Sequence, residues 1–215
     1  MTTGISRQPE LPRSEVLFFD GFDELDSVGP WEVLSAAGFD LRAVGFPADV
    51  RTVCGANGIR VHVDGPIGEA PGMLIVPGGG WILGSDVGVR PLVTAGVLPA
   101  LIARLHGAGT ILASVCTGAM LLAEAGLLRN RPSVTNRLAL DDLRSTGADV
   151  RADARVVDDG DVLTCGGPLA GIDLGIRIVE RCLGPDAARA ATERLEHERR
   201  GPLVVTGGEG ALSRT

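Results

Sequence analysis

Short apolar runs alternate along this chain with longer stretches in which apolar residues recur at helical spacing. The predicted strands are 15–20, 39–45, 73–76, 110–115 and 133–135, with hairpins at 50–63 and, across Asp158-Asp159-Gly160, at 154–164. The predicted helices are 24–37, 98–106, 117–125, 138–145, 169–182 and 186–197. Strands that alternate with helices predict an α/β fold in which a mostly parallel sheet has helices on both faces.

The length of 215 residues is sufficient for one domain with a sizeable core, which we assign to residues 15–200. Residues 1–14 are polar and contain prolines, so we expect a flexible N-terminal segment. The tail from Gly201 to residue 215 is rich in glycine and polar residues, so we expect it to be loosely held. The chain shows no internal repeat.

The net negative charge of the chain disfavours some classes of binding partner. A net charge of -7 and a pI near 5.0 repel phosphate backbones and anionic membranes, so neither nucleic acid nor a membrane is an expected partner. The start, MTTGISRQPELPR, has no apolar leader core, and no later run reaches the roughly 18 apolar residues of a membrane span. We therefore expect a cytoplasmic protein.

The four cysteines are widely separated, with no CxxC pair and no histidine at metal-ligand spacing, so we do not expect a zinc site. Cys116 differs from the others because it lies between an apolar strand and an Ala/Leu-rich helix, flanked by small residues. That is the pattern of a nucleophile elbow. A helix N-terminus predicts a lowered thiol pKa, and the N–H of Thr117 would face the same reaction centre. From the local pattern alone, a buried packing cysteine is equally compatible.

Two further segments are candidates for the site of Cys116, and the first of them should lie at the same sheet edge. Pro77-Gly78-Gly79-Gly80 follows a buried strand, and its glycines permit close backbone approach and an N–H donor for developing negative charge. A plain turn is the alternative, and the spacing matches neither a dinucleotide fingerprint nor a P-loop. Asp26 lies between Leu25 and Val28, where its carboxylate could turn inward and exchange a proton with the thiol.

Other titratable residues have simpler expected roles. Asp23 and Glu24 stand at a predicted helix start, where solvated capping carboxylates are common. His62, His106 and His197 have no evident cysteine partner in the sequence. A Cys-His-Asp triad is therefore not indicated.

Four motifs in order resemble the ThiJ/PfpI superfamily, of the class I glutamine amidotransferase-like group, and within it most closely the isonitrile (isocyanide) hydratases. They are Leu25-Asp26-Ser27-Val28-Gly29-Pro30, Val76-Pro77-Gly78-Gly79, Ser114-Val115-Cys116-Thr117-Gly118 and Ala170-Gly171-Ile172-Asp173. The similarity runs from about Glu15 to His197. It implies a flavodoxin-like sandwich, usually a homodimer, that acts on a small electrophilic molecule.

The resemblance also implies roles for individual residues. Cys116 would be the nucleophile, Asp26 the neighbouring acid, and the amides of Gly79 and Thr117 an oxyanion-type pocket, with Gly80 beside it. The implied chemistry is thiolate attack on the isonitrile carbon, followed by hydrolysis of a thioimidate to an N-substituted formamide. No cofactor is implied.

The chain departs from the family pattern near this pocket. Asn136 and Arg137 stand where members often carry His and Trp, and Leu169 stands where hydratases tend to have Ser or Thr. We expect Leu169 in the pocket wall and Arg137 either there or in solvent. Alternatives are a glyoxalase-like or deglycase-like enzyme, which usually uses a glutamate partner, a specialised-biosynthesis enzyme, and a non-catalytic ligand or redox sensor.

Overall fold

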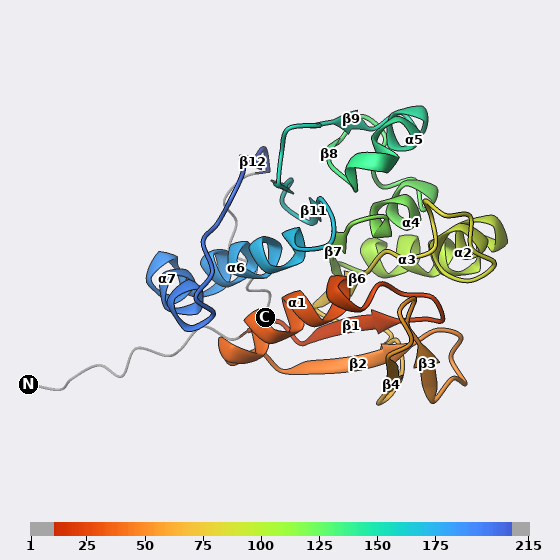
Figure 1. The fold of residues 1–215 in the computed structure, drawn as a ribbon, viewed down its shortest axis with the longest axis horizontal. Coiled ribbons are helices and arrows are strands. Elements are labelled where there is room, and N and C mark those ends of the chain that lie inside the picture. The colour runs from red at the N-terminus through yellow and green to blue at the C-terminus, as the bar shows by residue number, and fades with distance from the viewer. Residues whose placement is uncertain (1–10, 208–215) are drawn as a thin grey trace, which may run out of the picture.

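The computed structural model describes residues 11–207, and its centre is one eight-stranded sheet (Figure 1). The strand order is β12-β10-β11-β7-β6-β1-β2-β5, and all neighbours are parallel except β10 and β11. These strands are β1 (Ser14–Phe18), β2 (Leu41–Gly45), β5 (Gly65–Pro66), β6 (Met73–Val76), β7 (Ile111–Val115), β10 (Val156–Asp158), β11 (Val162–Cys165) and β12 (Leu203–Val205). Two small sheets pair β3 (Thr52–Cys54) with β4 (Arg60–His62) and β8 (Pro132–Ser133) with β9 (Asp149–Val150).

Helices surround this sheet and form two contacting groups (Figure 1). The helices are α1 (Glu24–Ala36), α2 (Val89–Ala95), α3 (Val97–Gly107), α4 (Gly118–Glu124), α5 (Leu140–Ser145), α6 (Ala170–Leu183) and α7 (Pro185–Arg194), with a 3-10 turn at Arg137–Ala139. Helix α6 packs against α1 and α7, whereas α2, α3 and α4 pack against one another. The arrangement confirms the predicted flavodoxin-like α/β fold.

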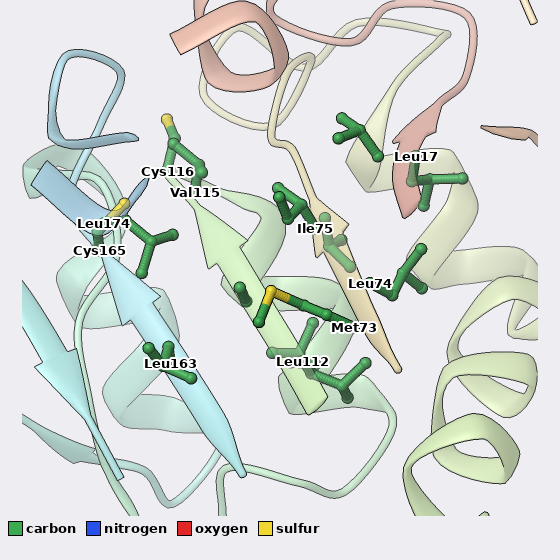
Figure 2. Packing of buried hydrophobic residues seen from close by; sticks show 14 of the residues in the cluster. Leu17, Met73, Leu74, Ile75, Leu112, Val115, Cys116, Leu163, Cys165 and Leu174 are labelled. Atoms are coloured by element: carbon green, nitrogen blue, oxygen red, sulfur yellow. The ribbon is translucent and has the colours of Figure 1, made fainter. Parts of the chain in front are cut away.

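Burial on both faces explains why β6 and the second half of β1 consist of apolar residues. Every residue of β1 and β6 is buried, because parallel strands in this position are covered on both faces. Figure 2 shows Leu74 and Ile75 of β6 beside Leu112 and Val115 of β7, within a single cluster of buried side chains.

The sheet extends further toward both ends of the chain than we predicted. Strand β12 pairs in parallel with β10, placing Leu203 opposite Val156, so the expectation of a loose tail from Gly201 is wrong for its first residues. Apolar Leu203–Val205 can extend the sheet edge although the surrounding composition is that of a tail. At the other end, Ser14 already belongs to β1. Residues 1–10 and 208–215 lie outside the described residues.

Helix α2 and strands β5 and β9 were not predicted. Helix α2 has only seven residues, contains Pro91 and lies between Gly88 and Gly96, so its sequence shows no clear helical pattern. Strands β5 and β9 have two residues each, which is too short for a recognisable strand pattern. Within residues 11–207, no helix combines the length and apolar character that crossing a bilayer requires.

Candidate active site

Three turns meet at one edge of the sheet. Strands β1, β6 and β7 are parallel neighbours, so their carboxyl ends lie at the same edge. β1 leads to the turn at Gly21, β6 leads to Pro77-Gly78-Gly79-Gly80, and β7 ends one residue before Cys116. The sequence therefore brings the predicted glycine turn and the predicted nucleophile together.

Cys116 occupies a strained backbone position between β7 and α4. Its φ is +54°, in the left-handed region that non-glycine residues rarely adopt. Two buried hydrogen bonds hold this turn: Cys116 N–H donates to Gly166 O at 3.0 Å, and Thr135 Oγ1 donates to Cys116 O at 2.8 Å. A strained turn from a strand into a helix is the geometry of a nucleophile elbow.

The sulfur of Cys116 projects from the end of β7, away from the core cluster around it (Figure 2). Asn136 Nδ2 donates to Sγ at 3.3 Å. Gly167 also approaches closely, because a Cβ at that position would lie 2.5 Å from Sγ. Only 6% of Cys116 is exposed, so the thiol sits in a nearly closed site.

Asp26 turns inward from helix α1, as we predicted. The residue has 0% exposure, and its Oδ2 accepts a hydrogen bond from Gly78 N–H at 2.8 Å. Burial, and after it the negative charge of Asp23, raises the pKa of Asp26 to about 8, although the Gly78 amide and the Cys116 thiol oppose the rise. The side chain is therefore mostly a carboxylic acid at neutral pH.

The predicted direction of the Cys116 pKa is wrong. Burial, and then the charge of Asp26, raises the pKa of the thiol to about 12, whereas the Asn136 amide and the Thr117 N–H lower it. The start of α4 does favour a thiolate, but the loss of solvent around Cys116, a residue that is only 6% exposed, outweighs it. In its resting state the site therefore holds a thiol beside a carboxylic acid.

The glycine turn is more than a plain connection. Gly79 and Gly80 have φ of +124° and +71°, and a Cβ would strike Gly21 O at the first position and Val87 O at the second. Gly79 N–H donates to Thr117 Oγ1 at 3.1 Å. An oxyanion role for this amide therefore requires that the Thr117 hydroxyl release it, whereas Thr117 N–H already faces the sulfur.

A cavity of about 610 Å³ opens above Cys116, within the volume range of small-molecule sites. Cys116, Thr117, Gly79, Gly80 and Asn136 all line it. Its remaining lining consists of Asp20, Gly21, Asp23, Cys54, Gly55, Ala56, Asn57, Trp81, Ile82, Leu83, Ser85, Val87 and Pro168.

Leu169 and Arg137 both lie outside the lining of this cavity. Leu169 is 54% exposed and does not line the cavity, because it points outward at the start of α6 while its neighbour Pro168 supplies the wall. Arg137 is exposed and lines a separate hollow of about 320 Å³.

Glu24 is buried rather than solvated, contrary to our expectation. It is 7% exposed and accepts hydrogen bonds from Asn57 N–H at 2.7 Å, Asn57 Nδ2 at 2.6 Å and Ile59 N–H at 3.3 Å. These bonds tie the tip of the β3–β4 hairpin to α1. Asp23 is the capping residue, since its Oδ1 accepts from Leu25 N–H at 3.1 Å.

The three histidines pair away from the thiol. His62 contacts Thr52 at 2.8 Å, His106 contacts Asp161 at 2.8 Å and His197 contacts Asp173 at 2.9 Å. None of them lines the cavity. Among residues 11–207 no group of three or more His, Cys, Asp or Glu side chains is arranged to hold a metal ion.

Sequence reasoning did not identify three contributors to the site: the Gly78 amide, the Thr135 hydroxyl and the backbone of Gly167. It noted Asn136 only as a departure from a family pattern. Their positions in the sequence could have indicated them. Asn136 comes shortly after β8, and Gly167 comes shortly after β11, which is the parallel neighbour of the strand that leads to Cys116.

Comparison with known proteins agrees with this geometry. The DJ-1/PfpI family profile matches residues 13–181. The chain belongs to the DJ-1/PfpI family. Among DJ-1/PfpI relatives, isonitrile hydratase of Pseudomonas putida is 30% identical over 183 residues, covering 84% of this chain and 76% of that protein. A deglycase of Thermococcus kodakarensis is 28% identical, over 67% of this chain and 84% of that protein.

Solved structures of DJ-1/PfpI proteins share the fold. A ThiJ/PfpI family protein from Pseudomonas syringae superposes with a TM-score of 0.75 at 22% identity, covering 91% of this chain and 78% of that one. Oxidized DJ-1 of Toxoplasma gondii also gives a TM-score of 0.75, at 20% identity, with 88% of this chain and 100% of that one covered.

Proposed function

We propose that this DJ-1/PfpI protein is a cofactor-free, cysteine-dependent hydratase that converts an isonitrile to an N-substituted formamide. The observation that carries the proposal is that the buried Asp26 carboxyl group and the Cys116-Thr117 turn meet at Gly78, where an added Cβ would lie 2.9 Å from Asp26 Oδ2 and 2.6 Å from Thr117 N. Burial raises the pKa of Asp26 to about 8. Hydration of an isonitrile requires a nucleophile and a proton donor at the same carbon, and Cys116 and Asp26 supply both. The similarity to isonitrile hydratase of Pseudomonas putida supports the choice of substrate.

In the first step the isonitrile carbon gains both a sulfur and a proton. Asp26 donates its proton to the terminal carbon as Cys116 Sγ attacks it, and the carboxylate takes up the thiol proton. A C–S and a C–H bond form, and the product is a thioimidate, R–N=CH–S–Cys. Asp26 is again protonated, so no charge accumulates in this nearly closed site.

In the second step water replaces the sulfur. The oxygen of water attacks the same carbon, the nitrogen gains a proton, and the C–S bond breaks to leave R–NH–CHO. Asp26 relays one water proton, and Cys116 returns to the thiol. The Asn136 amide, at 3.3 Å from Sγ, stabilises the departing sulfur while it carries negative charge.

The experiment is turnover of a simple alkyl isonitrile, followed by NMR detection of the formamide proton. We expect the wild type to produce formamide, and Cys116→Ala and Asp26→Asn to lose it, while Cys182→Ala, which changes a cysteine outside the cavity lining, keeps it. A methylglyoxal assay runs in parallel. Turnover that survives in Cys116→Ala, or consumption of methylglyoxal with no isonitrile turnover, would refute the hydratase assignment.

We also propose that the chain forms a homodimer, as its family resemblance implies. Sedimentation velocity tests this, because a dimer has twice the chain mass of 22.2 kDa. A single species at the chain mass across the micromolar range would contradict the proposal.

A further inference from the structure

The charged side chains that line the cavity all carry the same sign. Asp20 and Asp23 contribute carboxylates, and none of the described lining residues is Lys, Arg or His. A cavity with one sign of charge and low-dielectric walls attracts ligands of the opposite sign and repels those of the same sign.

Both carboxylates are held in place and are not neutralised by neighbours. Asp20 Oδ1 accepts a hydrogen bond from Cys54 N–H at 2.9 Å, and Asp23 Oδ1 caps helix α1. Within residues 11–207 neither side chain has an ion-pair partner. The field of Asp23 also reaches the reacting groups, because its charge raises the pKa of both Asp26 and Cys116.

Another part of the cavity wall is apolar. It comes from segment 81–87, whose Trp81, Ile82, Leu83 and Val87 all line the cavity. Leu83 is 94% exposed and Ile82 is 42% exposed, so these side chains have apolar surface available to a ligand. The nearby cation Arg90 is not among the lining residues; it lies 4.6 Å over the Trp81 ring and donates to Trp81 O.

We propose that the substrate of this site is an electrophile with an apolar body and a positively charged amino group, and that molecules bearing carboxylate or phosphate are excluded. This inference rests on the proposed function in one respect, namely that the substrate reacts with Cys116 from this cavity. The apolar wall receives the body of the substrate, and Asp20 and Asp23 attract its ammonium group.

The test measures how charge affects the reaction of Cys116 without using any isonitrile. Methanethiosulfonates with a trimethylammonium, a neutral or a sulfonate group are applied to Cys54→Ser/Cys182→Ser protein, because Cys54 also lines the cavity. Rates of Cys116 modification, read by mass spectrometry, are divided by the rates of each reagent with 2-mercaptoethanol. Asp20→Asn/Asp23→Asn in the same background removes both charges and keeps both side-chain acceptors.

We expect the cationic reagent to exceed the anionic one by at least about tenfold at low salt, because two carboxylates act on probes of opposite charge. The ratio should fall at least threefold in the double Asn variant and also in about 0.5 M salt. A ratio near one, or a ratio that the double variant leaves unchanged, would overturn the charge selection while the neutral reagent still reports a reachable thiol. Failure of all three reagents to modify Cys116 would overturn the proposed function and this inference together.

A second measurement uses turnover. Two isonitriles with the same apolar body, one ending in an ammonium group and the other in a carboxylate, are compared by kcat/KM. We expect the ammonium compound to be favoured at least tenfold and Asp20→Asn/Asp23→Asn to reduce that preference. Equal values in the wild type would refute the substrate class but leave the hydratase activity standing.

Discussion

Replacing Asp26 by Asn should abolish turnover and at the same time stabilise the fold near neutral pH. The substitution keeps the shape of the side chain and an oxygen for the Gly78 amide, which donates to Asp26 Oδ2 at 2.8 Å. In the proposed reaction it removes the proton that the isonitrile carbon receives, so we expect turnover to fall by about 10²- to 10⁴-fold. Above about pH 8, where Asp26 is charged, it also removes a charge that raises the pKa of Cys116, so iodoacetamide should alkylate the thiol faster there.

The size of the stability effect follows from the pKa of Asp26. Burial, and then the charge of Asp23, raises this pKa from 3.8 to about 8. The folded protein therefore holds a proton that the unfolded chain releases, and the contribution is complete below pH 3.8 and is lost as pH rises toward 8. Each pH unit within this interval lowers the free energy of unfolding by about 1.4 kcal/mol, so the loss between about pH 4.5 and 7.5 approaches about 4 kcal/mol.

Urea unfolding at a series of pH values measures this difference. The free energy of unfolding of Asp26→Asn, minus that of the wild type, should grow steadily from about pH 4.5 to 7.5. Asp40→Asn, which removes an exposed carboxylate, should follow the wild type within about 0.5 kcal/mol. Parallel pH curves for the wild type and Asp26→Asn would show that Asp26 is not held as an acid, and would remove the proton donor from the proposed reaction.

Three further predictions concern the surroundings of the thiol. Asn136→Leu removes the amide that lowers the pKa of Cys116, so alkylation by iodoacetamide should slow several-fold; faster alkylation would be inconsistent with its contact to Sγ. Gly78→Ala places a Cβ 2.5 Å from Thr117 Oγ1 and should cost about 1–3 kcal/mol in urea unfolding, together with activity. Gly107→Ala is the control, because its Cβ would meet nothing within 4 Å, and it should leave stability unchanged or raise it by up to about 1 kcal/mol. Equal losses of stability in Gly78→Ala and Gly107→Ala would argue against crowding at Gly78. Cys116→Gly relieves the φ of +54° and should be about 1 kcal/mol more stable than Cys116→Ala by thermal unfolding; the opposite order would mean that the elbow is not strained.

The sequence predicts the scaffold of the site well, because local patterns determine it. Met73–Val76 is a fully apolar run between Gly72 and Pro77, and the structure has the strand at those residues. The turn at Cys116 was predictable because an apolar strand meets a helix there without room for a loop. Asp26 is buried as predicted, but Leu25 and Val28, on which that prediction rested, are exposed, so those neighbours are not the reason for its inward turn.

What the sequence did not predict depends on contacts between distant segments. The pKa of Cys116 rises because burial and Asp26 act on it, and a helix-start argument contains neither effect. Leu169 was expected in the pocket wall because it stands where hydratases tend to have Ser or Thr, but it is 54% exposed and does not line the cavity. Glu24 looked like a cap, whereas its partners Asn57 and Ile59 lie more than thirty positions away. Strand β12 forms by pairing with β10, and a local sequence pattern does not reveal a pairing between distant segments.

The burial of Glu24 links the cavity wall to the helix that carries Asp26. Glu24 fastens the β3–β4 hairpin to α1, and the same helix carries Asp26. The positions of the hairpin side of the cavity and of Asp26 therefore depend on one helix. The other side, 81–87, is fixed independently, through Trp81 Nε1, which donates to Asp142 Oδ2 at 2.7 Å, and through Arg90. Substitutions in 81–87 should therefore change the ligands that the cavity accepts without moving Asp26, whereas substitutions at the hairpin tip should disturb both the cavity and the helix that carries Asp26.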